Sequence, residues 1–180
     1  MALELQAHGR HEAFQREWRA RLDRITEAVV LGDARTAVAV GREAYIDAMR
    51  SGEWRDLIDV GDAALRIGEV EGFAETPRGA ARQSYLTALY RAEAQRAVEG
   101  VLRVAEAFAA LGDHAAVEGC VAIAYRVADG DAEARARVSV FAGRFAMAAA
   151  GAQYGARKPE PTMEIERSGL SDRTFRSGDF

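Results

Sequence analysis

Residues 98–131 read VEGVLRVAEAFAALGDHAAVEGCVAIAYRVADGD and contain two apolar helical stripes separated by a short turn. Steps of three and four residues place apolar side chains on one face of an α-helix. Between the stripes, Gly112 favours the left-handed conformation that ends a helix, and Asp113 offers a carboxylate to the first amides of the next helix. The stretch therefore predicts a helical hairpin. The members of the two stripes are Val98, Val101, Ala105, Phe108 and Ala109, then Val117, Val121 and Ala124.

The pair of a glycine followed by an aspartate recurs at residues 32–33 and 130–131. The segment LGDARTAVAVGREA from residue 31 aligns without a gap with LGDHAAVEGCVAIA from residue 111. Gly32, Gly72 and Gly112 fall 40 residues apart, each at the end of a predicted helix. A period of this length is typical of stacked helical hairpins.

Further apolar stripes predict the remaining helices. Their first members are Phe14, Ala34, Trp54, Ala81 and Val138, and the second stripe includes Val38 and Tyr45. Thr76 and Pro77 supply an N-cap and a first-turn proline for the fourth helix. We expect Val101, Phe108, Val121 and Phe141 in the core. Glycine costs about 1 kcal/mol inside a helix, so we attribute Gly41, Gly61, Gly100, Gly119 and Gly143 to close helix crossings.

Composition agrees with an all-α fold. The chain has 180 residues, 38 of them alanine, and only Pro77 of its three prolines lies before residue 158. Alanine is the best helix former and proline the worst, so a β-rich fold is unfavourable. The length suits one domain with its own core.

Residues 98–131 resemble one tetratricopeptide repeat. Small Ala105, aromatic Phe108, the LGD turn and small Ala124 carry the resemblance. Val117 departs from the usual alanine of the second helix, and no proline follows the repeat. The resemblance implies an all-α solenoid of stacked antiparallel hairpins, about three of them plus a terminal capping helix. We assign residues 1–13 to an N-terminal extension, 14–157 to the repeat domain and 158–180 to a tail.

Such repeats bind proteins or peptides, so the resemblance implies an adaptor, chaperone or assembly factor. Small solenoids of this length resemble the bacterial secretion chaperones that hold an extended peptide in a concave groove. The groove would be lined by the first helix of each hairpin, where charged side chains lie away from the apolar stripes. These candidate partner-binding residues are Arg21, Arg24, Arg55, Asp62, Arg103 and Glu106. The alternative is a compact bundle that binds a small ligand or forms a structural subunit.

The residues give no support for catalysis, a metal or a cofactor. His8 and His11 share a helix face but have no cysteine nearby, and Cys120 has the pattern of a small core residue. Acids and arginines four residues apart predict solvated ion pairs on helix surfaces, namely Arg55 with Asp59, Asp62 with Arg66, and Glu99 with Arg103. Glycine-containing segments lack phosphate-loop spacing. We expect no enzyme activity.

The formal net charge of −4 argues against nucleic acid or anionic membranes as partners. The N-terminal segment lacks the apolar core of a signal peptide, no window is apolar enough for a membrane span, and the single cysteine excludes an internal disulfide. We therefore expect a cytoplasmic protein.

The composition changes at Lys158, after which no alanine occurs. Apolar residues recur along the tail with the spacing of anchors, notably Met163, Ile165, Leu170, Phe175 and Phe180. Ordering about 20 residues costs more backbone entropy than five anchors return. We therefore expect the tail to become ordered only against another chain, a partner or a second copy in a homo-oligomer.

Overall fold

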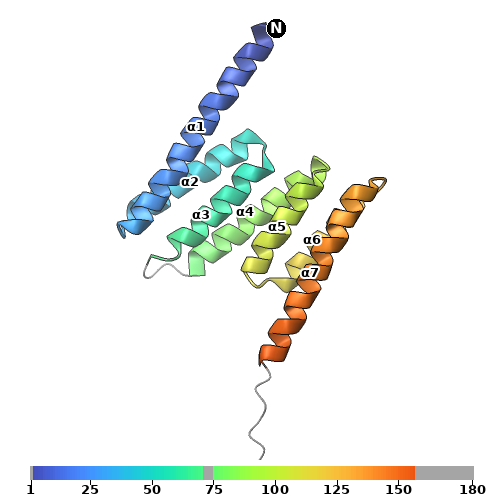
Figure 1. Cartoon of the computed structure of the whole chain (residues 1–180). Coiled ribbons are helices and arrows are strands. Elements are labelled where there is room, and N and C mark those ends of the chain that lie inside the picture. Colours follow the sequence, from blue (N-terminus) through green and yellow to red (C-terminus); the bar gives the residue numbers. More distant parts are fainter. Residues whose placement is uncertain (1, 71–74, 157–180) are drawn as a thin grey trace, which may run out of the picture. The chain divides into compact units, whose positions relative to one another are not determined.

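A computed structural model describes residues 2–70 and 75–156, and these residues form seven α-helices and no strand (Figure 1). The predicted all-α class with packed helical hairpins is confirmed. The helices are α1 (Ala2–Val30), α2 (Ala34–Ser51), α3 (Trp54–Ile67), α4 (Glu75–Ala94), α5 (Val98–Ala110), α6 (His114–Val127) and α7 (Ala132–Ala156).

The glycine-aspartate turns form as predicted. Gly32, Gly112 and Gly130 all have a positive φ, which glycine adopts without the steric cost of a Cβ atom. Each following aspartate then caps the next helix by accepting a hydrogen bond from a backbone N–H. The three bonds run from Thr36 to Asp33 at 3.0 Å, from Ala116 to Asp113 at 3.2 Å and from Ala134 to Asp131 at 2.9 Å. Gly72, the middle member of the 40-residue period, lies outside the described residues.

Successive helices pack against each other from α1 to α6, and contacts of α1 with α3, α3 with α5 and α4 with α6 stack one hairpin on the next. The core of this unit, which ends at Arg144, follows the predicted stripes. Its fully buried side chains include Ile25, Leu57, Tyr85, Val101, Phe108, Val117 and Val138. A stack of helical hairpins is thus present, which is the coarser part of the resemblance stated above.

Several local expectations need correction. Val121 is half-buried rather than part of the core, whereas Val101, Phe108 and Phe141 are buried. Helix α1 begins at Ala2, although its apolar stripe starts only at Phe14, because good helix formers continue the helix without a stripe. Helix α4 begins one residue before Thr76. Beyond Arg144, the last part of α7 belongs to a separate unit, and its Met147 is exposed.

Candidate functional site

Four of the six predicted partner-binding residues lie on the third and fifth helices. Arg55 of α3 stacks over its neighbour Trp54 at 4.2 Å and reaches Glu99 of α5 at 3.5 Å. On α5, Arg103 pairs with Glu106 at 2.8 Å, and Glu99 lies one turn before Arg103. Together with Asp62, which is two turns after Arg55 on α3, these side chains form a polar surface that we name the α3–α5 face.

The charged side chains of the α3–α5 face already have partners, on the face itself or on neighbouring helices. Asp62 accepts a 2.6 Å hydrogen bond from the hydroxyl of Tyr85, and the neighbouring Asp59 accepts one of 3.1 Å from Nε1 of Trp18. Burial raises the pKa of Asp59, an effect that the Trp18 bond opposes. The ion pairs predicted at a spacing of four residues, namely Arg55 with Asp59, Asp62 with Arg66, and Glu99 with Arg103, are therefore wrong. Instead, Arg55 pairs with Glu99, Arg103 pairs with Glu106, and Asp62 bonds to Tyr85.

The two predicted residues of α1 do not join this face in a common network. Arg21 forms an ion pair with Asp47 of α2, and both side chains are about one-quarter exposed at 26%. Arg21 therefore ties the first hairpin together. Arg24 is exposed. The anchors predicted in the tail, Ile165, Leu170, Phe175 and Phe180, lie outside the described residues, as does Met163.

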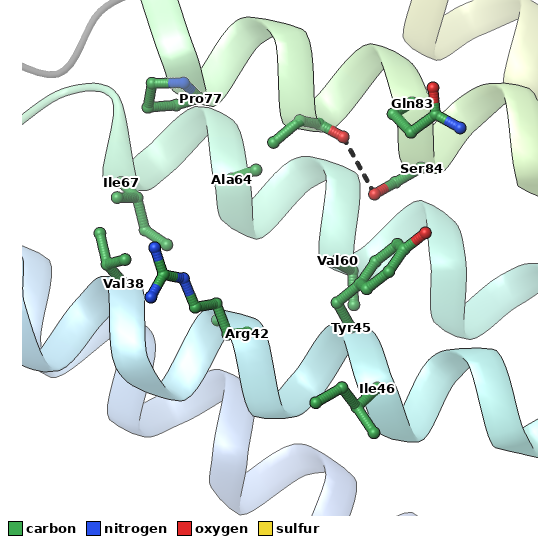
Figure 2. Close-up of a pocket in the computed structure, with 12 residues that line it drawn as sticks. Val38, Arg42, Tyr45, Ile46, Val60, Ala64, Ile67, Pro77, Gln83 and Ser84 are labelled. Carbon is green, nitrogen blue, oxygen red and sulfur yellow. Dashed lines mark hydrogen bonds between the residues drawn. The ribbon is translucent and has the colours of Figure 1, made fainter.

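A pocket of about 680 Å³, which was not predicted from the sequence, lies between α2 and α4, with α3 as its floor (Figure 2). We name it the α2–α4 pocket. Most of its lining is apolar. The lining residues are Val38, Gly41, Arg42, Tyr45 and Ile46 of α2, Val60, Ala64 and Ile67 of α3, and Pro77, Ala80, Gln83 and Ser84 of α4.

Hydrogen bonds join α4 to the C-terminal end of α2, next to the pocket. The two helices run in the same direction, since each is antiparallel to α3 (Figure 1). The guanidinium of Arg91 on α4 donates hydrogen bonds to the carbonyls of Ala48 at 2.7 Å and Met49 at 2.8 Å, and Gln95 donates one of 3.0 Å to the carbonyl of Gly52. These bonds satisfy carbonyls at the C-terminal end of α2. The pocket lies along the earlier turns of both helices.

The polar atoms in the lining are few, and one of them is already used. Ser84 is buried, and its hydroxyl donates a 3.1 Å bond to the carbonyl of Ala80. Gly41 allows close packing at the floor, since a Cβ atom there would lie 3.0 Å from Cδ1 of Ile67. Among the residues that line the pocket, Arg42 is the one that carries a charge. The lining therefore suits apolar groups.

Apolar surface continues beyond the pocket. Ile46, a lining residue, is 49% exposed, and Met49 lies one turn further along α2 at 42%. The sequence contains one indication of this surface: apolar residues cover more of the circumference of α2 than a single buried stripe needs. The buried stripe of α2 consists of Ala37, Val40, Ala44 and Ala48. Val38 and Tyr45 are half-buried and lie at the margin of that stripe.

The groups considered for chemistry are dispersed. Cys120 is fully buried, and burial, with a smaller effect of Asp113, raises the pKa of its thiol to about 12. His114 is exposed at the start of α6, and the side chains of His8 and His11 lie outside the described residues. Among the side chains that the structure describes, no three histidines, cysteines or acids gather as metal ligands.

In comparisons with known proteins, no protein family, no curated protein and no solved structure matches the chain. None of the described helices combines the length and the apolar character that crossing a membrane requires.

Proposed function

We propose that the chain is a non-enzymatic binding module that receives a segment of a partner protein in the α2–α4 pocket. The observation that carries this proposal is an apolar concavity of about 680 Å³ lined by three helices. Apolar side chains of a partner would displace water from such a surface with a gain in free energy. The packing of α3 against both α2 and α4 holds the three helices in place.

A protein partner accounts for more of the surface than a small ligand does. A small ligand would fill the pocket and leave the exposed Met49, one turn beyond Ile46, uncovered. A partner segment that fills the pocket would also cover apolar residues at its margin. Exposed apolar patches rimmed by polar groups are a common feature of protein interaction sites.

In this proposal the module acts as an adaptor, chaperone or assembly factor of tetratricopeptide type in the bacterial cytoplasm. The α3–α5 face, with Arg55, Asp62, Arg103 and Glu106, is a second candidate contact. Its internal ion pairs are solvent-exposed, and such pairs are weak enough to be exchanged for pairs with a partner. The main apolar contact is assigned to the pocket.

The test is affinity capture from the native host with tagged variants. Ala80→Trp places a large ring in the pocket, and Ala122→Trp is the matched control on an exposed position of α6. The proposal expects Ala80→Trp to lose the captured partner and Ala122→Trp to retain it, with the two variants melting at similar temperatures. If Ala80→Trp retains the partner while the double reversal of Arg55 and Arg103 to Glu loses it, the pocket is not the binding site.

A further inference from the structure

We infer that the partner segment in the α2–α4 pocket is an amphipathic helix with an acidic side chain beside its apolar face. This inference rests on the proposed function and specifies the chemistry of the partner. It follows from three properties of the pocket: the scarcity of polar groups in the lining, its length along two parallel helices, and the single positive charge that Arg42 adds to the lining.

The lining favours a helix over an extended segment. An extended segment would bring its N–H and C=O groups into an apolar groove, where unpaired polar groups are costly. The floor offers them no side-chain partner, because the lining residues of α3, Val60, Ala64 and Ile67, are apolar. The Ser84 hydroxyl already bonds to the carbonyl of Ala80, and the remaining polar side chains lie on α2 and α4. A helix satisfies its backbone internally and presents only side chains. The sequence-based expectation of an extended peptide therefore does not fit this pocket.

The length of the pocket determines which side chains of a bound helix would contact it. From Val38 to Ile46 the α2 rim covers eight helical steps, or about 12 Å at 1.5 Å per residue. The α4 rim, from Pro77 to Ser84, covers nearly the same length. A helix lying along both rims would contact them over two to three turns, with apolar side chains at i, i+3 or i+4, and i+7.

Arg42 supplies the charge preference. Its neighbours on the same face of α2, at i−4, i+3 and i+4, are Val38, Tyr45 and Ile46, none of which is acidic. Figure 2 shows the Arg42 side chain extending from α2 over the pocket toward the α3 side. An ion pair that is partly shielded from water by apolar groups is stronger than one on an open surface. A carboxylate on the partner helix beside its apolar face would form such a pair.

The probe is a synthetic alanine-based helix of about 15 residues, labelled with fluorescein, with leucines at i, i+3 and i+7 and a glutamate next to the middle leucine. Three companion peptides replace the glutamate by glutamine, the glutamate by lysine, or the leucines by alanine. Fluorescence anisotropy measures binding to the full chain. We expect the glutamate peptide to bind about fivefold more tightly than the lysine peptide, the size of a modest ion pair, and the alanine peptide not to bind.

A charge exchange locates the contact. Arg42→Glu should reverse the preference, so that the lysine peptide binds better than the glutamate peptide. Arg50→Glu changes the same charge on the same helix at a side chain that is 77% exposed, and it should leave the preference as in the unchanged protein. Ala80→Trp should abolish binding of every peptide, whereas Ala122→Trp should not.

Three results with the peptides would overturn the inference. They are a failure of the glutamate peptide to bind, equal binding of the glutamate and lysine peptides, and a charge preference that Arg42→Glu leaves unchanged. A dimer in sedimentation that Ala80→Trp dissociates would assign the pocket to a second copy and would also overturn it. The proposed function is tested separately, because loss of the captured host partner in Ala80→Trp would still support the pocket as a protein-binding site.

Discussion

The hydroxyl of Tyr85 on α4 donates a 2.6 Å hydrogen bond to Oδ1 of Asp62 on α3. The ring of Tyr85 reaches Asp62 by crossing α3 at Gly61, where a Cβ atom would lie only 2.2 Å from Cε1 of the ring. The ring also meets Phe108 of α5 edge-on, with ring centroids 5.8 Å apart. Burial and the bond to Asp62 both raise the pKa of Tyr85. One side chain thus links three helices of the core to the α3–α5 face.

We predict that Gly61→Ala destabilises the protein. The added methyl group would overlap the Tyr85 ring, and overpacking of this kind costs about 1 to 3 kcal/mol. Gly119→Ala is the matched control, because a Cβ atom there meets nothing within 4 Å. Alanine should stabilise that position by up to about 1 kcal/mol. Urea unfolding measures both, and equal effects of the two substitutions would contradict the close crossing at Gly61.

Phe108→Ala should lower the free energy of unfolding by about 3 to 5 kcal/mol. The ring is fully buried in contact with Tyr85, and its removal leaves a cavity. Val121→Ala should cost much less, since Val121 is half-buried. A thermal melt that barely moves in the Phe108 variant would contradict the assigned core.

The thiol of Cys120 should be unreactive in the native protein. A thiol-specific reagent at pH 8 should label it only after denaturant is added, because the thiol is buried and mostly protonated. Its pKa rises from an ordinary 9.0 to about 12 on folding, so the unfolded chain loses the proton first as the pH increases. The free energy of unfolding should therefore fall between about pH 9 and 12. Cys120→Ala should have a shallower decline; an unchanged slope would exclude this contribution.

Asp113→Ala should cost about 1 kcal/mol, because the N-cap of α6 is lost. Asp113→Asn keeps a capping oxygen and should retain most of the stability. The bond from Arg82 and the N–H of Ala116 lower the pKa of Asp113 below 3.8, so its contribution is present above pH 3.8 and lost as the pH falls through the folded-state pKa. Unfolding curves at pH 7 and at acid pH check both statements. A gap between the variant and the unchanged protein that stays constant into acid would contradict them.

The turns of this fold could be predicted from the sequence because their determinants are local. A left-handed glycine and a capping aspartate act within a few residues, as at Gly112 and Asp113. The buried stripes were predictable for the same reason. The close crossings were predicted correctly for Gly61 and Gly100, whereas Gly119 and Gly143 face open space, which helical periodicity alone does not distinguish.

The binding surfaces were less predictable because they depend on contacts between distant residues. Arg91 and the Ala48 carbonyl are 43 residues apart, and their bond joins α4 to α2 next to the pocket. Likewise, Arg21 in the first helix of its hairpin pairs with Asp47 of the second helix, 26 residues away. A charge on a helix surface carries no local mark of whether it will find its partner across a hairpin or in another protein.

The central claim, that the α2–α4 pocket receives a partner protein, is tested most directly by photo-crosslinking in the native host. A photoreactive phenylalanine analogue replaces Ile46 at the rim of the pocket in one variant and Glu106 on the α3–α5 face in another. The account predicts a discrete crosslinked product from position 46 that disappears when Ala80→Trp is added. Crosslinking from position 106 together with none from position 46 would contradict it.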